Sequence, residues 1–423
     1  MVIRNLYTLL LFLLSPVLLF TLYKKKAGKP SFGPRWKEHF GITPPLKNQS
    51  QRPIWIHTVS VGETIAATPF IRALKQQYPY TPIVISTTTS TGAEQAAKLS
   101  DIAEHRYMPI DFPFAIKGFL RVIRPQSMLI METELWPNTL YHVAKFGVPI
   151  TVINARLSER SALRYQKFQP IFNLLAKSLS QVLCQHRDDA ERFIRLGVDP
   201  TRVKITGSLK FDITVSEESL KAGAQLRLLL GRKRPTWIAA STHQGEDEQV
   251  LDAHKLLLKR YPEALLILVP RHPERFDDVY KLSTSTGFTT QRRTDTTEPS
   301  LKTQVYLADT MGEMLTLIEA ADICFMGGSL LGDKVGGHNV LEPAALAKPI
   351  LIGPSYFNFS DITNNLKNQN SLFIIHSPEE IYEKIDWMIS NNISHELGLK
   401  SKKFIEKNKG TVKKTVKLIN EVI

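Results

Sequence analysis

Short apolar runs alternate with helical patterns along most of the chain. This alternation is typical of parallel βαβ layers, in which each buried strand is followed by a helix. A first series of expected strands covers residues 54–59, 83–87, 128–131, 150–154, 182–185 and 203–206. A second series covers 237–240, 265–269, 305–308, 323–326, 350–352 and 372–375. The pattern therefore predicts an α/β protein with two doubly wound, Rossmann-like domains, whose ligands bind outside the carboxyl ends of the strands, facing an interdomain cleft.

The N-terminal segment has a different pattern. Leu6–Tyr23 is almost wholly apolar and about as long as a helix that crosses a bilayer core. A secretory signal carries its charge before the apolar run, whereas here Lys24–Lys26 follow it. The segment is therefore expected to be an uncleaved signal-anchor, a transmembrane helix with the remaining chain on the cytoplasmic side. Pro16 leaves a kinked or shallow insertion open.

These patterns divide the chain into five segments. We expect a membrane anchor at 1–26, a first Rossmann-like domain at 27–210, a linker at 211–235, a second Rossmann-like domain at 236–392 and a basic C-terminal helix at 393–423. That last segment carries eight lysines between Lys400 and Lys417. They form either a solvated helix face or a patch for an anionic membrane or substrate.

Composition and charge limit the class of protein and the kinds of partner that it can bind. The 423 residues are 43% apolar and 22% charged, which excludes disordered and disulfide-scaffold proteins. The net charge of +14 favours an anionic partner, either nucleic acid, acidic lipid or a phosphorylated substrate. Nothing but charge supports nucleic acid, since no aromatic-rich basic element is present. Cys184 and Cys324 stand far apart, so no disulfide framework or zinc site is predicted.

Acidic residues follow two expected strands of the first domain. Glu63 lies at a helix start, where the helix dipole favours the ionised form that a general base needs. The alternative is an ordinary capping acid. Glu132 and Glu134 precede Trp136 directly after another strand, and either a loop-capping role or a role in the cleft is possible.

A cationic residue follows each of two other expected strands of this domain. Arg156 follows one strand and Lys210 follows another. Arginine and lysine in such places suit a carboxylate or a phosphate, although surface salt bridges are the plain alternative.

The second domain offers paired glycines and polar residues after its strands. These motifs are Ser241–His243, Pro270–Pro273, Met311–Met314, Gly327–Ser329 and Gly336–Pro343. Paired glycines before a helix allow backbone N–H groups to approach a phosphate, and a carboxylate such as Glu342 can accept hydrogen bonds from ribose hydroxyls.

Several common nucleotide and metal motifs are missing from the sequence. It contains no G-x-G-x-x-G at a βαβ start and no G-x-x-x-x-G-K-[ST], which argues against dinucleotide-binding dehydrogenases and P-loop NTPases. It also contains no H-E-x-x-H and no Asp-x-Asp. The histidines of the strand-end loops are expected to form hydrogen bonds, and no metal site is predicted.

The order of these motifs resembles one family. Its pieces are Ser60–Thr64, Met131–Asn138, Asn154–Ser158, Gly207–Asp212, Pro270–Phe276, Met311–Met314 and His338–Pro343. In this order the chain resembles the 3-deoxy-D-manno-octulosonic acid (Kdo) transferases of lipopolysaccharide biosynthesis, which are GT-B glycosyltransferases. The resemblance runs from the anchor to about residue 390.

The resemblance implies that the domain at 27–210 binds the acceptor and that the domain at 236–392 binds the donor, and it also implies roles for individual residues. It implies that Glu63 is the base that deprotonates the acceptor hydroxyl, and that Glu132 and Lys210 support the transition state. It implies contacts to the donor, CMP-Kdo, from Arg271, His272, Gly312, Glu313, Met314, Asn339, Val340, Leu341 and Glu342. The implied reaction is an inverting transfer of Kdo to a lipid A precursor, lipid IVA, on the cytoplasmic face of the inner membrane, without a metal or cofactor.

Two other functions stay open at this point. One is another GT-B nucleotide-sugar transferase, such as a heptosyl or N-acetylglucosaminyl transferase. The other is a non-catalytic membrane module that binds anionic lipid. The same motifs fit transfer of one, two or more Kdo residues, and they leave open the acyl pattern of the acceptor, the oligomeric state and the role of residues 331–336.

Overall fold

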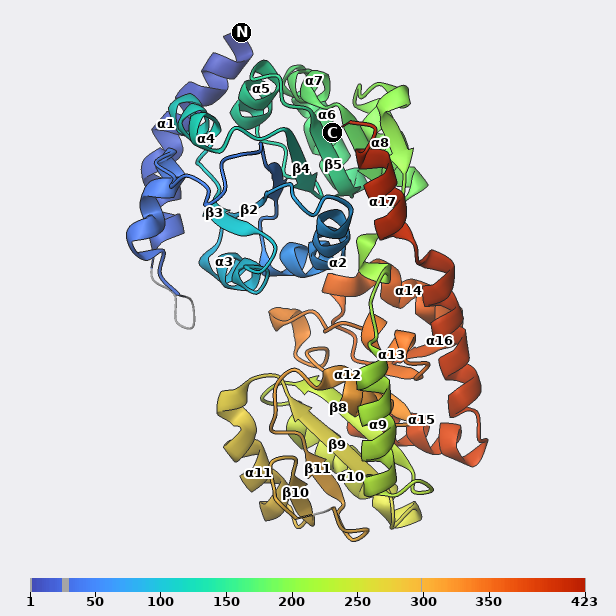
Figure 1. Cartoon of the computed structure of the whole chain (residues 1–423). Helices are drawn as coiled ribbons and strands as arrows, with labels where there is room; N and C mark the ends of the chain where they lie inside the picture. Colours follow the sequence, from blue (N-terminus) through green and yellow to red (C-terminus); the bar gives the residue numbers. More distant parts are fainter. Residues whose placement is uncertain (1, 25–29, 298, 423) are drawn as a thin grey trace. The chain divides into compact units, whose positions relative to one another are not determined.

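The chain folds into two compact units. A computed structural model describes residues 2–24, 30–297 and 299–422. Unit 1 comprises Met1–Asp212 and Gly410–Ile423, and unit 2 comprises Ile213–Lys409. Each unit has a seven-stranded parallel sheet with helices between its strands (Figure 1). The predicted fold class of two doubly wound α/β domains is confirmed.

The sheet of unit 1 has the order β3-β2-β1-β4-β5-β6-β7. Because β1 pairs with both β2 and β4, the strand order reverses beside β1, where such sheets bind their ligands. Buried Trp55 of β1 packs on Phe119, with ring centroids 4.6 Å apart. The strands are β1 (Ile54–His57), β2 (Ile83–Thr87), β3 (Glu104–Tyr107), β4 (Ser127–Met131), β5 (Ile150–Ala155), β6 (Gln181–Cys184) and β7 (Val203–Ile205).

The helices of unit 1 begin where polar caps follow strands. Ser60, Thr89 and Ser158 each accept a hydrogen bond from a backbone N–H of the first turn that follows. The elements are α1 (Val2–Tyr23), η1 (Gly33–Phe40), α2 (Val61–Gln77), α3 (Ser90–Ala97), α4 (Pro113–Ile123), α5 (Pro137–Lys145), α6 (Glu159–Lys167), α7 (Gln169–Ser178), α8 (Arg187–Arg195), η2 (Pro200–Arg202), η3 (Leu209–Phe211) and α17 (Thr411–Ile419).

The N-terminal helix α1 is long and apolar enough to cross a membrane by length and composition. The predicted N-terminal anchor helix is thus a candidate anchor in the structure as well. Lys25 and Lys26 of the predicted cationic flank lie outside the described residues.

The sheet of unit 2 has the order β10-β11-β9-β8-β12-β13-β14. Its strands are β8 (Thr236–Thr242), β9 (Leu265–Pro270), β10 (Thr290–Arg292), β11 (Val305–Leu307), β12 (Ile323–Met326), β13 (Ile350–Ile352) and β14 (Leu372–Ile374). Its helices are α9 (Glu217–Leu230), α10 (Asp247–Arg260), η4 (Pro273–Arg275), α11 (Phe276–Ser285), α12 (Met314–Glu319), η5 (Gly332–Lys334), α13 (Leu341–Ala345), η6 (Phe357–Phe359), α14 (Ser360–Asn368), α15 (Pro378–Ser390) and α16 (Ser394–Asn408).

Two predicted segments have more structure than expected. The segment 211–235, expected to be a linker, contains α9, which packs on α12 within unit 2. The basic segment 393–423, expected to be one helix, forms α16 in unit 2 and α17 in unit 1. The two helices are separated at Gly410, whose φ of 95° is a left-handed conformation that glycine adopts readily.

The second part of that basic segment returns to the first domain. The Asp212 carboxylate accepts a hydrogen bond from Gly410 N at 2.6 Å and another from Val412 N. Lys204 forms an ion pair with Glu421 at 2.7 Å, and α17 packs on α2. Helix α17 therefore supports the helix that begins at the Glu63 turn.

Candidate active site

The turn after β1 positions Glu63. Ser60 is the N-cap of α2, and its Oγ accepts a hydrogen bond from Glu63 N at 3.4 Å. In return, Oε2 of Glu63 accepts from Val59 N at 2.9 Å, and Oε1 lies 3.3 Å from Ser60 Oγ. These reciprocal contacts resemble a capping box. Glu63 therefore does cap the start of α2, as the alternative interpretation proposed, and these contacts fix the position of its carboxylate.

The electrostatic setting of Glu63 differs from the expected one. Burial raises the pKa of Glu63, the negative charges of Glu132 and Glu134 add to this effect, and the hydrogen bond from Val59 opposes it; together they bring the pKa to about 7. The helix dipole was expected to keep this carboxylate ionised, but burial and like charges outweigh it. A carboxyl group that titrates near neutral pH is suited to general base catalysis.

The loop after β4 brings the other two carboxylates to this turn. Glu132 has a φ of 57°, a strained conformation for a residue with a side chain, and its N–H donates to Ile153 O at 3.0 Å. Burial raises the pKa of Glu134, which accepts a hydrogen bond from the side chain of Trp136. Since β4 pairs with β1, both carboxylates share the sheet edge with Glu63.

The 3-10 helix η3 places Lys210 near the same helix. Leu209 N donates to the Oδ1 atom of buried Asn154 at 3.0 Å, and η3 contacts α2. Asn154 lies near the end of β5, the neighbour of β4 in the sheet, and has a φ of 52°. The structure thus brings Glu63, Glu132 and Lys210 to the carboxyl edge of one sheet. Arg156, just beyond β5, accepts a hydrogen bond at its carbonyl from the Thr133 hydroxyl.

An apolar groove of about 800 Å³ lies beside this edge. Its walls include the end of α1, the 3-10 helix η1 and the start of α3, and the aromatic side chains of Tyr23, Phe32, Trp36 and Phe40 line it together with Leu19, Leu22, Thr89 and Ser90. The hydroxyl of Thr89 donates to Val59 O at 3.4 Å. The groove therefore reaches Thr89, which contacts the residue that precedes the Ser60–Glu63 turn.

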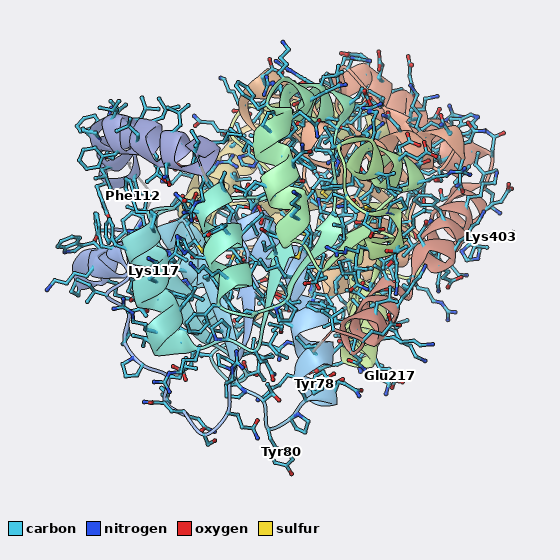
Figure 2. The ribbon with its side chains drawn as sticks, turned by 90° about the horizontal axis from the view of Figure 1, so that it is seen from above. Tyr78, Tyr80, Phe112, Lys117, Glu217 and Lys403 are labelled. Carbon is cyan, nitrogen blue, oxygen red and sulfur yellow. The ribbon has the colours of Figure 1, made fainter. Side chains whose placement is uncertain are left out.

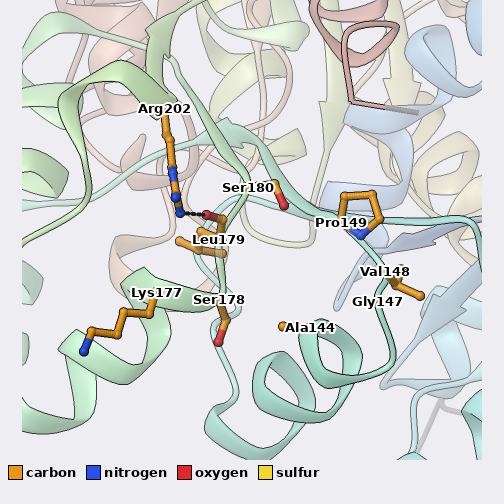
Figure 3. A pocket seen from close by; sticks show the side chains of 9 residues that line it. All are labelled: Ala144, Gly147, Val148, Pro149, Lys177, Ser178, Leu179, Ser180 and Arg202. Atoms are coloured by element: carbon orange, nitrogen blue, oxygen red, sulfur yellow. Dashed lines mark hydrogen bonds between the residues drawn. The ribbon is translucent and has the colours of Figure 1, made fainter.

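A second hollow of about 500 Å³ belongs to the opposite edge of the same sheet. Val148 and Pro149 lead into β5, Leu179 and Ser180 lead into β6, and Arg202 donates to Leu179 O at 2.9 Å (Figure 3). Because these residues lie at the amino ends of the strands, the hollow takes no part in the Glu63 site.

In unit 2 a buried carboxylate occupies the place predicted for a phosphate. Glu246 is completely buried, and its oxygens accept hydrogen bonds from Gly328 N at 2.7 Å, Ser329 N at 2.8 Å, Leu330 N at 2.9 Å and His243 N at 3.0 Å. The prediction that the Gly327–Ser329 backbone approaches a phosphate is wrong, because Glu246 already satisfies these donors.

The glycines of these loops instead allow close packing. A Cβ at Gly327 would lie 2.5 Å from the Ser241 carbonyl oxygen. Gly337 of the other glycine pair donates its N–H to Gly328 O at 2.8 Å. The two glycine loops thus bind each other. Glu246 was missed because its spacing from His243 is typical of any helix start.

Three histidines gather around the strand ends of unit 2. Nε2 of His243 lies 2.8 Å from Nε2 of His338, and the ring centroids of His243 and His272 are 5.3 Å apart. Burial lowers the pKa of His338 to about 3, helped by the nearby His243 and Arg271. Burial also lowers the pKa of His243, and at 2.8 Å one of the two rings can donate a hydrogen bond to the other. Arg271 N donates to Thr242 O at 2.9 Å, which fixes this strand end beside the histidines.

The residues predicted to bind the donor in the 339–342 segment are of two kinds, polar side chains and buried apolar ones. Asn339 donates to Glu342 Oε1 at 3.0 Å, and burial raises the pKa of Glu342 against Asn339 and Arg271. The side chains of Val340 and Leu341 are buried in the core, so they can offer a ligand only their backbone. Leu341 N already donates to Asn339 Oδ1 at 3.2 Å.

The predicted residues after β11 form a separate group. Glu313 pairs with Arg293 at 3.0 Å, and this hydrogen bond lowers the pKa of Glu313. Gly312 is exposed, with a φ of 88°, and Met314 begins α12. Since β11 pairs with β9, this group lies at the same edge of the sheet as Arg271 and His272.

No group of three or more histidine, cysteine or acidic side chains within residues 2–24, 30–297 and 299–422 has the arrangement of a metal site. The residues brought together here instead offer a carboxylate of raised pKa, cations and hydrogen-bond donors.

Comparisons with known proteins agree with one another. Residues 34–213 match the family described as 3-Deoxy-D-manno-octulosonic-acid transferase (kdotransferase). A 3-deoxy-D-manno-octulosonic acid transferase of Haemophilus influenzae is 37% identical over 98% of this chain and 98% of its own length. One of Bordetella pertussis is 35% identical over 85% of each chain. A glycosyltransferase from Rickettsia africae has a similar fold, with a TM-score of 0.56 and 12% identity, over 88% of this chain and 99% of that chain.

Proposed function

This chain belongs to the family of Kdo transferases and is a glycosyltransferase, and we propose that it transfers Kdo from CMP-Kdo to a lipid A precursor, lipid IVA. In this proposal unit 1 binds the lipid acceptor and unit 2 binds the donor. The observation that carries it is Glu63, a partly buried carboxylate with a pKa of about 7 at the carboxyl edge of the unit 1 sheet.

The proposed reaction is a single displacement. Glu63 takes the proton of an acceptor hydroxyl, the oxygen attacks the anomeric carbon of Kdo, and the bond to the CMP phosphate breaks. One attack from the face opposite the leaving group inverts the anomeric centre. CMP leaves with the bonding electron pair, and Glu132 and Lys210 support the charges that develop.

The residues of unit 2 suit a nucleotide monophosphate. Arg271 can bind a phosphate through two donors, and the neighbouring imidazoles of His243 and His272 supply polar contacts. Asn339 and Glu342 offer an amide and a carboxylate for ribose hydroxyls. Gly312 and Met314 offer an exposed turn and a flexible side chain beside them.

Features of unit 1 favour a lipid acceptor at a membrane. Thr89 lines the apolar groove and hydrogen-bonds to Val59, so acyl chains bound in the groove would lie near the Glu63 turn. The net charge of +14 and the apolar α1 favour an anionic membrane surface, and we place the enzyme on the cytoplasmic side of the inner membrane. Its partners in this proposal are CMP-Kdo, the lipid acceptor and the membrane, without nucleic acid.

The test is product formation by the purified full-length protein from CMP-Kdo and lipid IVA in vesicles, followed by mass spectrometry. A mass increase of one or more Kdo residues supports the proposal and gives their number. Binding of both substrates without a product would support the non-catalytic membrane module instead. A product from a heptose or N-acetylglucosamine donor alone would point to another GT-B transferase.

We expect the transfer to continue in excess EDTA. At the carboxyl edge of each sheet, the described side chains offer cations and hydrogen-bond donors to the departing phosphate. No group of these described side chains is arranged as a metal site. The measurement is the initial rate with EDTA and after added Mg²⁺. Loss of the rate in EDTA and its return with Mg²⁺ would contradict a metal-independent reaction.

A further inference from the structure

Helix α1 contacts the body of unit 1 along one stripe. The less exposed side chains of α1 recur at helical spacing: Arg4, Tyr7, Thr8, Leu11, Ser15, Leu19, Leu22 and Tyr23. Leu11 and Tyr7 pack against Phe112 and Ala115 at the start of α4, where Figure 2 shows Phe112 close to α1. This periodicity is unusual for a helix that faces lipid all round.

Polar side chains hold the N-terminal half of α1. The Arg4 guanidinium lies 3.2 Å from His142 Nε2 and 3.7 Å from the centroid of the Tyr141 ring. Thr8 Oγ1 accepts a hydrogen bond from Asn138 Nδ2 at 2.9 Å. Such contacts with α5 require the N-terminal half of α1 to lie against unit 1, not across a bilayer from it.

The C-terminal end of α1 is held by the same unit. The Tyr23 hydroxyl lies 2.8 Å from Nδ1 of His39, and the Tyr23 ring packs edge-on against Phe32 with centroids 5.5 Å apart. The helix rises about 33 Å over its length at 1.5 Å per residue. A helix that crossed the bilayer would carry one end about that far from unit 1, yet both ends contact it.

The opposite face of α1 is apolar and exposed. Eleven of its aliphatic and phenylalanine side chains are at least 43% exposed: Val2, Ile3, Leu6, Leu9, Leu10, Phe12, Leu13, Leu14, Val17, Leu18 and Phe20. Phe114 of α4, 60% exposed, stacks on Phe112 next to this face. An apolar surface of this size marks an interaction site.

Cations lie near both ends of this surface. At the N-terminal end, Arg4, Lys117 and Lys145 lie near His142. Burial, together with the charges of these three residues, lowers the pKa of His142 to about 4. Lys117 is labelled in Figure 2. At the other end is Lys24. A spanning helix is expected to have cations mainly at its cytoplasmic end. A helix that lies in the interface has its cations along the membrane surface, so they can occur near both of its ends.

We propose that α1 is an in-plane anchor: it stays docked on unit 1 by its polar stripe, and its exposed face inserts into one leaflet of an anionic bilayer without crossing it. The occupant of the apolar face is thus the acyl region of that single leaflet. Headgroups of acidic lipids lie against the cations at both ends.

Cysteine labelling of the full-length protein in inner-membrane preparations tests this topology. Asn5→Cys marks the polar, exposed start of α1, and Tyr80→Cys, 82% exposed, marks the body of unit 1 (Figure 2). A membrane-impermeant maleimide is added to spheroplasts or to inverted vesicles. Native Cys184 and Cys324 are buried, and unsubstituted protein gives their background. Labelling of both sites in the same preparation supports the in-plane anchor. Labelling of Asn5→Cys from the side opposite Tyr80→Cys overturns it.

A cysteine pair gives a second measurement that does not depend on reagent access. Thr8→Cys with Asn138→Cys replaces a pair in contact, whereas Leu13→Cys with Asn138→Cys has one partner on the outward face. Oxidation on membranes is expected to form a disulfide in the first pair only. Absence of that disulfide in membrane-bound protein would overturn the proposal, because in a spanning helix Thr8 would lie about 22 Å from the Tyr23 end. Neither measurement uses Kdo transfer, so each stands apart from the proposed function.

Discussion

At the residue scale, Glu63 has two roles that one substitution can separate. Its carboxylate accepts the Val59 N–H and thereby supports the start of α2, and it is the proposed base. Glu63→Gln retains an oxygen for that N–H but cannot take a proton. We expect kcat to fall by about 10²–10⁴-fold, with little change in CMP affinity or melting temperature. The measurements are steady-state kinetics and thermal unfolding, with exposed Glu94→Gln as the control.

If Glu63 were a capping acid only, the pattern would reverse. The melting temperature would fall in line with a loss of about 0.5–2 kcal/mol, and turnover would stay near that of the unsubstituted protein. Near-normal transfer by Glu63→Gln would remove Glu63 as the base.

The pKa of Glu63 predicts a pH profile. Because burial and the charges of Glu132 and Glu134 raise the pKa to about 7, the carboxyl group binds a proton as the pH falls below that value. A protonated base is inactive, so kcat/KM is expected to fall about tenfold per pH unit on the acid side. Glu132→Gln removes one like charge and should move this limb to lower pH. A profile that is flat from pH 5 to pH 8 would contradict the assignment.

A substitution of Arg271 can likewise distinguish a role in donor binding from a structural role. Its proposed contact is to the CMP phosphate, away from the acceptor hydroxyl. Arg271→Ala should raise KM for CMP-Kdo by about 10- to 100-fold, the range for losing a hydrogen bond between charged groups, with a smaller effect on kcat. Donor-dependent kinetics and the melting temperature are measured together. A lower melting temperature with an unchanged donor KM would indicate a structural arginine.

At the element scale, the buried central strands could be predicted and the polar edge strands could not. Strand β1 and its neighbours read as apolar runs because both faces of the sheet are covered. Strand β3 (Glu104–Tyr107) contains Glu104 and Arg106, which form an ion pair, and β10 (Thr290–Arg292) is half-buried and polar. Neither gives an apolar run, so the sequence pattern could not identify them.

The same contrast holds for the candidate sites. Glu63, Glu132 and Arg271 could be placed because residues after parallel strands meet at one edge of a sheet. The loop around Glu246 could not, because its role depends on backbone N–H groups from a segment some 80 residues away in the chain. Only tertiary contact reveals that a carboxylate, not a ligand, satisfies those donors.

Glu246 therefore gives a prediction about the loop itself. Glu246→Gln presents an amide NH₂ to at least one backbone N–H and loses the charge that the others share. We expect unit 2 to lose about 2–4 kcal/mol of stability, since buried donors are left unsatisfied. Denaturant unfolding measures this, with exposed Glu248→Gln in the first turn of α10 as the matched control. Equal midpoints for both variants would show that the loop does not depend on this carboxylate.

For the whole molecule, the main core of unit 1 does not depend on α1. The large apolar clusters around β1–β7 contain no residue of α1, and Leu11 and Tyr7 belong only to a small cluster with Phe112 and Ala115. Removal of the helix is therefore expected to leave both sheets, the Glu63 turn and the donor residues of unit 2 in place. Apart from the wall that its C-terminal end gives to the apolar groove, the helix is thus an attachment whose main effect should be on where the enzyme works.

Deletion of residues 1–26 tests that division. The truncated protein is expected to fold and to bind CMP with unchanged affinity, because its donor residues all lie in unit 2. Its rate on lipid acceptor in vesicles should fall about tenfold or more at low protein concentration, since the anchor raises the local concentration of enzyme at the membrane. In detergent micelles, where enzyme and lipid meet without a bilayer, the two proteins should differ less. Equal rates on vesicles would show that α1 has no anchoring role, and a weaker CMP affinity would show that it supports the fold of the whole chain.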